Sequence, residues 1–331
     1  MSRVLIVIFL LGYNFANAKV IIDDFGRTVE VPDKIEKIYS PASPLTLNLL
    51  SFNPSLVAAL NSPLTAEQSK FIGIDSKTPI IGGMSGQGMT LNVERIATLN
   101  PDVILIWDKP FDIEFVIDKL KPLNKPIIAV KFDSISDLSK QYELFGKLSG
   151  DTKRSDTLIE YTNKTLTEYK NIGKTLNRPL TYYFADGLDG LTTVCEGSYH
   201  TEPFTFTDSK NSLDCKMTTV FNSHKTSIEN IMQANPDYII GFNKSFIDNL
   251  NNKPIWKDLK AVKKGNFALI PTKPFNYISR PPSFMRLIGI RWIMSTMHPD
   301  KFNSIEKEQR EFEKLFFPNN KDNLWLLDCL L

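Results

Sequence analysis

The chain has 331 residues, of which 42% are hydrophobic and 11% aromatic. This apolar content excludes a disordered chain, and the length suits two domains, each with its own core. Lys and Arg number 39 and Asp and Glu 37, which leaves a net charge of +2. Neither a nucleic acid nor an anionic membrane surface is therefore an expected partner.

Residues 1–18 have the three parts of a secretory signal. Arg3 lies near the start, an apolar run covers residues 4–11, and Ala16-Asn17-Ala18 forms a cleavage site of small residues. The run is shorter than the roughly 20 apolar residues that span a bilayer. We therefore expect cleavage after Ala18 and a soluble periplasmic protein that begins at Lys19, with no Cys at its start to carry a lipid anchor.

The following segments alternate between strand and helix patterns. A hairpin is predicted from residues 20–23 and 28–31, which flank a turn that contains Gly26. Further strands are predicted at residues 35–39, 57–60, 80–81, 103–106 and 127–130, with a helix over residues 45–50. Strand-helix-strand order is typical of a mostly parallel sheet covered by helices.

One helix-and-strand unit occurs twice. Asn92-Val93-Glu94-Arg95-Ile96, followed by Asn100-Pro101-Asp102, recurs as Ser227-Ile228-Glu229-Asn230-Ile231, followed by Asn235-Pro236-Asp237, at an offset of 135 residues (229 minus 94). Each copy predicts a short helix, a turn at Asn-Pro-Asp and a buried strand. Solenoid repeats span roughly 20–50 residues, so this offset is too long for one. The duplication instead predicts two similar α/β lobes with a cleft between them.

A helical region is predicted between the lobes. Residues 135–176 contain no Pro, and Asp151 is suited to cap a helix whose apolar and aromatic positions recur every three or four residues. We expect this region to join the lobes as a strut. The predicted organisation is a signal peptide at 1–18, an N-terminal lobe at 19–134, a linking helix region at 135–177 and a C-terminal lobe at 178–331.

The second lobe repeats the pattern of the first. Strands are predicted at residues 180–184, 238–240 and 267–270, and an amphipathic helix near residues 283–297. Ligands of open parallel sheets bind beyond the carboxyl ends of the strands. Those ends lead into the loops that we expect to line the cleft, at residues 40–43, 82–88, 107–109, 185–190, 242–243 and 271–280.

Cysteine usage suits an exported protein. Cys195 and Cys215 are near enough in sequence to close a loop by a disulfide, and the alternative is two buried thiols. A disulfide would fix the segment that carries His200. Cys329, in the apolar tail, is expected to pack as a small hydrophobe.

Taken together, these features resemble the substrate-binding proteins of ABC importers for iron-siderophores, vitamin B12 and related metal chelates. The likeness covers essentially all of the mature chain. It rests on the signal, the Asp-Asp-Phe-Gly-Arg-Thr-Val-Glu-Val-Pro opening, both copies of the repeated unit, and Ser279-Arg280-Pro281-Pro282-Ser283 with Gly289 and Trp292 beyond it. The resemblance implies a class III fold, in which two α/β lobes are bridged by one long helix and hold the ligand between them.

The resemblance also implies an inner-membrane ABC permease as partner. In the family, the Glu of each repeated block pairs with Arg residues of the permease, which carries over to Glu94 and Glu229. One carboxylate on each lobe would give a two-point docking face, and the alternative is two solvent-facing carboxylates. We expect a monomer without a cofactor of its own, because the metal arrives with the ligand.

For the metal itself, the resemblance points to His224 and Tyr277. In catecholate-siderophore binders of the family, a His and a Tyr from similar loops complete an iron centre that a tetradentate chelator leaves open. The cargo would be Fe³⁺, with a Ni²⁺ chelate next; the alternative is a surface His and an aromatic cleft wall. A bare metal site built from both lobes is not expected, because all three histidines lie in the second lobe. We expect His200 at the surface, with a position facing the cleft as the alternative, and His298 at a helix end.

Other ligand contacts are predicted at the strand ends. Arg280 either clamps an anion or braces its own loop. Trp107 and Phe242 can stack on a planar ligand, and the loop that contains Gln87 offers backbone amides to an anion. Ser43 and Lys109 complete the predicted set.

The sequence therefore predicts a binding protein that captures a metal chelate, a ferric siderophore first, and delivers it to an ABC permease. A nickel chelate, cobalamin or haem, and an oxyanion such as molybdate are alternative ligands. The rival class is an exported metal-dependent enzyme that uses His224 with Asp186 or Glu196, but neither a Gly-x-Ser-x-Gly nor a His-Glu-x-x-His motif occurs. A cell-surface adhesion module is a third possibility.

Overall fold

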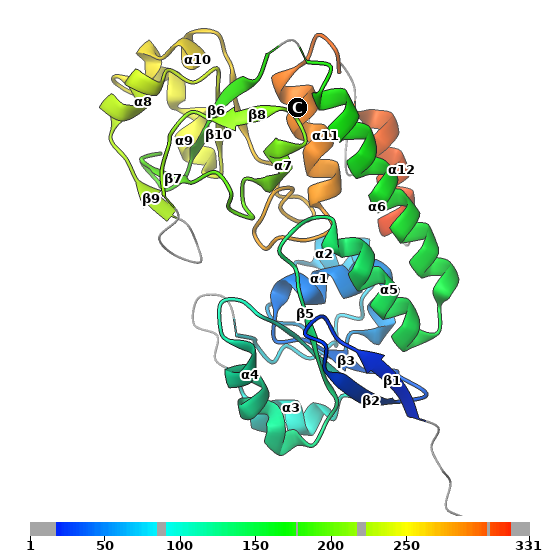
Figure 1. Ribbon diagram of the computed structural model, residues 1–331. Helices are drawn as coiled ribbons and strands as arrows, with labels where there is room; N and C mark the ends of the chain where they lie inside the picture. The colour runs from blue at the N-terminus through cyan, green and yellow to red at the C-terminus, as the bar shows by residue number, and fades with distance from the viewer. Residues whose placement is uncertain (1–17, 85–90, 177, 217–222, 303–304, 319–331) are drawn as a thin grey trace, which may run out of the picture.

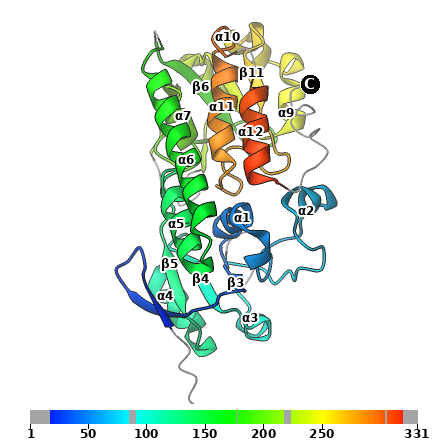
Figure 2. The ribbon, with the colours of Figure 1, turned by 90° about the vertical axis from the view of Figure 1, so that its right-hand side faces the viewer.

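The structure is a computed structural model that describes residues 18–84, 91–176, 178–216, 223–302 and 305–318. Two α/β lobes are stacked and joined along one side by a long helix (Figures 1 and 2). This confirms the predicted fold class. Residues 1–17, Gln87 and Cys329 lie outside the described residues, so the predicted signal and the roles given to Gln87 and Cys329 stay predictions.

The N-terminal lobe contains a short parallel sheet in the order β3-β4-β5, formed by Ile38–Tyr39, Val103–Trp107 and Ile127–Val130. Residues 57–60, predicted as a strand, contribute only isolated parallel bridges, from Val57 to Ile38 and from Leu60 to Ile80. The helices are α1 (Ser43–Phe52), α2 (Ala66–Ile72), α3 (Val93–Leu99) and α4 (Ile113–Leu120), with 3₁₀ turns η1 (Pro54–Leu56) and η2 (Lys121–Leu123).

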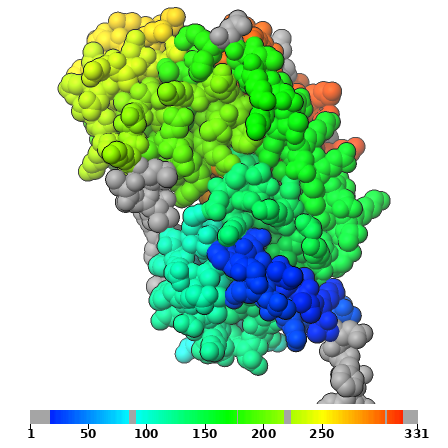
Figure 3. Space-filling view, viewed as in Figure 1, coloured from blue at the N-terminus to red at the C-terminus, as the bar shows by residue number. Residues whose placement is uncertain are grey.

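The predicted hairpin is confirmed as β1 (Ala18–Ile22) and β2 (Thr28–Pro32). Its turn is held by Asp23, whose carboxylate accepts hydrogen bonds from the Arg27 guanidinium at 2.6 and 2.8 Å and from the backbone N–H of Ala129 at 3.1 Å. The last bond fastens the hairpin to β5. Figure 3 shows the hairpin, in blue, on the outer surface of the lower lobe.

Both copies of the repeated unit fold alike. In the first copy, the Asn92 side chain accepts from the backbone N–H of Arg95 at the start of α3, and Asn100 ends the helix with a φ of 49°. In the second, Ser227 caps α8 (Ile228–Ala234) in the same way, and Asn235 ends it with a φ of 43°. Asn tolerates this left-handed conformation better than most residues, and the Pro that follows cannot extend the helix. Strands β4 and β10 (Tyr238–Gly241) follow directly.

The Asp of each copy fixes the neighbouring strand. Asp102 accepts from the backbone N–H groups of Glu36 and Lys37, both at 2.8 Å, just before β3. Asp237 accepts from the backbone N–H of Thr181 at 3.1 Å, in β6 (Leu180–Ala185). The repeated Asn-Pro-Asp therefore ends a helix and aligns two strands in each lobe.

The linker consists of α5 (Asp137–Ser149) and α6 (Thr152–Gly173), which pack against each other, with Gly150 ending the first helix. Helix α6 runs along one side from the upper lobe to the lower lobe, in contact with α11 of the upper lobe and α1 of the lower lobe (Figure 2). One apolar core continues through the strut, and it includes Leu45, Leu158 and Ile288. Such burial opposes large movements of one lobe against the other.

The C-terminal lobe has a parallel sheet in the order β11-β10-β6-β8, in which β8 is Ser209–Asn211 and β11 is Phe267–Leu269. Strands β7 (Thr192–Val194) and β9 (Ser223–Lys225) form an antiparallel pair. The helices are α7 (Glu202–Thr205), α9 (Lys244–Asp248), α10 (Lys260–Lys263), α11 (Arg286–Met297) and α12 (Glu306–Phe316), with 3₁₀ turns η3 (Leu250–Asn252) and η4 (Trp256–Asp258).

Helix α11 differs from the prediction. It was expected to be amphipathic, but it is buried on nearly every side because it lies between α6, α7 and α12. Gly289 allows this close packing, since a Cβ there would lie 2.1 Å from the carbonyl oxygen of Tyr277. Among the described residues, no helix is both long and apolar enough to cross a bilayer.

Candidate functional site

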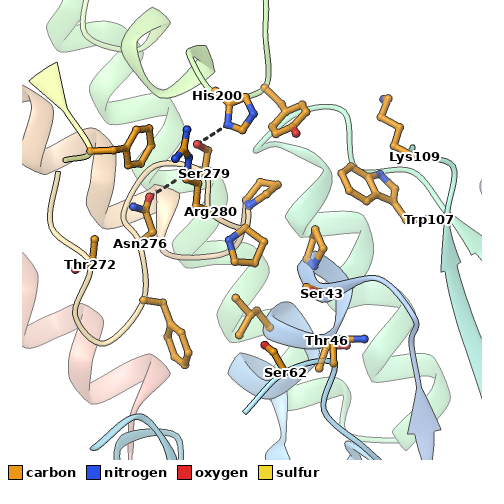
Figure 4. Close-up of a pocket in the computed structure, with 18 of the residues that line it drawn as sticks. Ser43, Thr46, Ser62, Trp107, Lys109, His200, Thr272, Asn276, Ser279 and Arg280 are labelled. Carbon is orange, nitrogen blue, oxygen red and sulfur yellow. Dashed lines mark hydrogen bonds between the residues drawn. The ribbon is translucent and has the colours of Figure 1, made fainter. Parts of the chain in front are cut away.

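A cavity of about 760 Å³ lies between the lobes, and five of the six loops predicted at the strand ends contribute residues to its walls, together with α1 and residues 60–64. Figure 4 shows the N-terminal wall, with Ser43 and Thr46 on α1, Trp107 at the end of β4 and Lys109 just after it. The opposite wall carries His200 and the loop that holds Ser279 and Arg280. The cavity therefore takes side chains from both lobes.

On the N-terminal wall, β4 is buried along its whole length and ends at Trp107, whose ring faces Tyr199 edge-on at 6.3 Å between centroids. The Lys109 ammonium forms an ion pair with Asp133, which follows β5. Ser43 is the first residue of α1. This wall thus combines an aromatic ring, a cation and a helix start.

On the C-terminal wall, Arg280 forms an ion pair with Asp186 and stacks on Phe242, with 4.0 Å from the guanidinium carbon to the ring centroid. These two partners come from the ends of β6 and β10. The guanidinium is therefore held over an aromatic ring, and the Arg280 side chain stays 45% exposed. An anionic ligand group could reach it from the cavity.

His200 belongs to this wall. The sequence analysis had favoured a position at the surface. It is 8% exposed, and its Nδ1 lies 2.6 Å from Oγ of Ser279. Burial, together with the Arg280 and Arg286 cations, lowers the pKa of His200 to about 3, against the opposing effect of Asp186. The imidazole is therefore neutral at neutral pH.

The segment that carries His200 is fixed from several sides. Cys195 and Cys215 form a disulfide at its base, which confirms the predicted pairing. Arg286, 1% exposed, donates at 2.6 Å both to the carbonyl oxygen of Tyr199 and to the Glu202 carboxylate. Glu202 also accepts from the backbone N–H of Ile135, in the chain that leaves the first lobe. The pair formed by Arg286 and Glu202 therefore connects this wall, in the second lobe, to the chain that leaves the first lobe.

The predicted site residues divide into two groups. Five of the described ones line the cavity: Ser43, Trp107, Lys109, Phe242 and Arg280. Tyr277 and His224 do not, because Tyr277 is 1% exposed beneath the cavity loop and His224 points to solvent from β9. The structure does not bring this pair together, so metal binding by His224 and Tyr277 stays a prediction that this arrangement does not favour.

Two further questions are whether the described residues form a metal-binding cluster and whether they form the catalytic site of the rival enzyme. Within the described ranges, no group of three or more His, Cys, Asp or Glu side chains could hold a metal ion. The rival enzyme used His224 with Asp186 or Glu196, but Asp186 is paired with Arg280 at the cavity and His224 lies outside it. Asp186 and His224 therefore do not form one catalytic site in this structure.

Two lobes joined by one helix, with a cavity between them built from strand ends, define a two-lobed solute-binding protein. The chain belongs to the periplasmic binding protein family, which residues 39–274 match. Among curated proteins, it is 22% identical over 227 residues to the uncharacterized ABC transporter substrate-binding lipoprotein YvrC of Bacillus subtilis, an alignment that covers 65% of this chain and 67% of that protein. The chain is thus an ABC transporter substrate-binding protein.

Solved structures agree in fold. An ABC transporter solute binding protein from Sulfurospirillum deleyianum is 28% identical, with a TM-score of 0.83 over 90% of this chain and 95% of that one. The molybdate periplasmic binding protein MolA of Haemophilus influenzae, solved with molybdate bound, is 18% identical, with a TM-score of 0.70 over 91% of this chain and 98% of that one. The proteins in this comparison are binding proteins by name.

Proposed function

We propose that the protein captures a preformed metal chelate, a ferric siderophore in the first place, and delivers it to an ABC permease. The observation that carries this is the cavity itself, which is large, lies between the lobes and has mixed aromatic and cationic walls. We also propose that the protein works outside the cytoplasm, as the family name and the sequence of residues 1–18 suggest.

The size and chemistry of the cavity favour a chelate over a bare ion. Its volume of about 760 Å³ falls within the roughly 300–1,000 Å³ of pockets for drug-sized molecules. The described walls hold no cluster of metal-binding side chains. A metal bound here would therefore bring most of its coordination sphere with it.

The charges favour an anionic ligand. The described lining includes two cations, Lys109 and Arg280, and one carboxylate, Asp186. The rings of Trp107, from the first lobe, and Phe242, from the second, add flat apolar surface. A ferric catecholate combines negative charge with planar rings, and it suits these walls better than a neutral ligand would. A nickel chelate is the next candidate.

A molybdate-type oxyanion is the second candidate ligand. Arg280, Ser279 and the neutral His200 form a polar group on one wall, and an oxyanion accepts hydrogen bonds from such donors. MolA, which has the same fold, was solved with molybdate. The cavity is much larger than a tetrahedral oxyanion needs, which is why we place this ligand second.

To deliver its ligand, the protein would dock on the permease through α3 and α8, the helices of the repeated unit. Glu94 and Glu229 are both exposed, each in the first turn of its helix, α3 and α8. These helices lie at the far ends of the two lobes in Figure 1, away from the cavity. Docking through them would leave the ligand contacts undisturbed.

Fluorescence titration tests the ligand class, because Trp107 lies in the cavity wall. We expect a ferric complex of a tetradentate bis-catecholate to quench the emission, and molybdate and cyanocobalamin to do so weakly or not at all. Arg280→Ala should weaken binding about ten- to a hundredfold, as for the loss of one charge-assisted contact. Arg310→Ala, on the surface of α12, is the matched control. Tighter binding of molybdate would favour the oxyanion, and no binding of any of the three would count against the proposal.

A further inference from the structure

One segment of the first lobe has little contact with the core of that lobe. Residues 61–79 leave the lobe after Leu60 and return to it at Ile80, and a parallel bridge joins Leu60 to Ile80. The segment contains α2, and its buried residues are Asn61, Ile72 and Ile74. A segment with so few buried residues can open locally at much lower cost than the whole lobe unfolds.

This segment forms a thin wall of the cavity. The residues of the segment that line the cavity are Asn61, Ser62, Pro63, Leu64 and Gln68. On its outer side, α2 borders a second hollow, and Leu64 lines both spaces. Figure 2 shows α2 at the edge of the lower lobe that lies away from α5 and α6. An outward movement of α2 would therefore widen the cavity on the side away from the strut.

The side of the cavity next to the strut is fixed. The apolar core continues from lobe to lobe through α6. Beside the start of α5, the Glu202 carboxylate of the second lobe accepts from the backbone N–H of Ile135 at 3.0 Å. Because these contacts oppose movement of the lobes, a change in the width of the cavity has to come from a local movement, as in other proteins that bind ligands beneath mobile loops.

A hydrogen bond holds α2 to the second lobe. Nε2 of Gln68 donates to the carbonyl oxygen of Pro274 at 2.5 Å. The rings of Phe71 and Phe317 add an edge-on contact, with 6.5 Å between centroids. Pro274 belongs to the loop that also carries Arg280, which lines the cavity. The bond therefore connects α2 to the wall where we expect the ligand to bind.

The amide of Gln68 is oriented for this bond. Its Oε1 accepts from the backbone N–H of Thr65 at 2.9 Å, and the backbone N–H of Gln68 donates to Oγ1 of Thr65 at 3.0 Å. This reciprocal pair is the capping box at the start of α2. Since the amide oxygen is occupied by the cap, the amide nitrogen is left to face Pro274.

We propose that residues 61–79 form a flap, which the bond between Gln68 and Pro274 holds shut and which opens to let ligand enter and leave the cavity. A ligand that contacts the loop of Arg280 would steady Pro274 and so favour the shut state. The flap would serve any ligand of this cavity, and it therefore goes beyond the chelate proposed above.

Spin labels measure the position of the flap in the ligand-free protein. They are attached at Glu67→Cys on α2 and at Lys314→Cys on α12, which are exposed positions, in the full chain with Cys329→Ser. Cys195 and Cys215 are joined in a disulfide and do not react with the label. Pulsed electron paramagnetic resonance then gives the distance between α2 and the second lobe.

Variants separate the bond to Pro274 from the cap. In Gln68→Glu the carboxylate can still accept from Thr65 but cannot donate to Pro274. The fraction of molecules with a longer label distance should rise about two- to tenfold, as for the loss of one hydrogen bond. Thr65→Ala is the matched control, because it removes one capping bond and leaves the donor to Pro274, and it should keep the parent distance. A parent-like distance in Gln68→Glu would overturn the flap.

Stopped-flow fluorescence with the ferric bis-catecholate tests the passage of ligand, and this measurement rests on the proposed function. Gln68→Met, which brings no charge to the cavity, should raise the association and dissociation rate constants together by about two- to tenfold and keep the Kd within about threefold. A rise in the dissociation rate alone would make Gln68 a ligand contact, and unchanged rates would also overturn the gating role. If the chelate does not bind at all, the proposed function fails, while the label distances still decide whether the flap exists.

Discussion

The side-chain oxygen of Asn48 accepts a hydrogen bond from the backbone N–H of Phe284 at 2.8 Å, across 236 residues of sequence. The same side chain donates to Oε1 of Gln141 at 2.8 Å. Asn48 lies on α1, Gln141 on α5 and Phe284 just before α11, so one fully buried amide joins the first lobe, the strut and the second lobe. Leu47, next to Asn48, and Pro282, two residues before Phe284, line the cavity, so the contact joins segments that form its walls.

Replacement of Asn48 by Ala should lower the free energy of unfolding by about 1–3 kcal/mol for each buried partner that it leaves unsatisfied. Urea denaturation measures the change. Asn163→Ala removes an exposed bond from Ser139 on the outside of the strut and should cost less than about 1 kcal/mol. Equal effects of the two substitutions would show that the buried contact contributes no more to the free energy of unfolding than the exposed bond does.

The repeated unit shows how much of the fold the sequence predicts. Residues 92–104 and 227–239 predict helix, turn and strand, and α3, β4, α8 and β10 form there, because caps and turns depend on neighbours in sequence. Residues 57–60 have the same strand pattern but form only bridges. The packing around α11, which buries both of its faces, involves distant segments that local periodicity does not report.

Asp237 should make stability depend on pH. Burial by itself raises the pKa of Asp237, but hydrogen bonds from Lys260, the backbone of Thr181 and Arg178 outweigh it and hold the pKa below its ordinary value. A carboxyl with a lowered folded-state pKa stabilises the protein above its unfolded pKa of roughly 3.9, and the contribution is lost as the pH falls further.

Asp237→Asn should therefore lower the free energy of unfolding at pH 7 by about 1–3 kcal/mol, and the difference from the parent should shrink below pH 4. Denaturation between pH 3 and pH 7 measures this. Asp248→Asn, which removes a surface ion pair with Lys244, should cost no more than about 1 kcal/mol. A difference that stays constant down to pH 3 would contradict the assignment.

Gly289 should not tolerate a side chain. An added Cβ would meet the backbone carbonyl of Tyr277 at 2.1 Å, and overpacking of this kind costs about 1–3 kcal/mol. Because Tyr277 lies in the loop that carries Ser279 and Arg280, Gly289→Ala should also weaken ligand binding. Thermal unfolding and the fluorescence titration measure the two effects. Parent-like stability and affinity would show that α11 can move away from the loop without consequence.

Replacing Glu94 and Glu229 together by Ala should abolish uptake of a ferric bis-catecholate by cells that carry the permease. Affinity for the same chelate should remain within about twofold, because both carboxylates are exposed on helices outside the cavity. The matched control is Glu114→Ala with Glu311→Ala, two exposed carboxylates on α4 and α12. Equal losses of affinity and uptake would mean that the two glutamates contact the ligand instead.

The site was less predictable than the fold. Strand ends place Trp107, Phe242 and Arg280 in the cavity, because the carboxyl edge of a parallel sheet is a general binding position. His200 has no such local signal, since its partner Ser279 is 79 residues away and the two meet only in the folded lobe. Tyr277 follows a strand end too, but the packing of α11 buries it.

Native mass spectrometry with metal analysis, on protein purified from its own cells, tests the central claim most directly. The proposal predicts one bound small molecule per chain, with Fe or Ni in a one-to-one ratio and a mass that includes an organic chelator. The bound fraction should fall in the Arg280→Ala variant, which lacks the cation of the cavity wall. A metal-free ligand, or a bare oxyanion of Mo, would contradict the chelate as cargo.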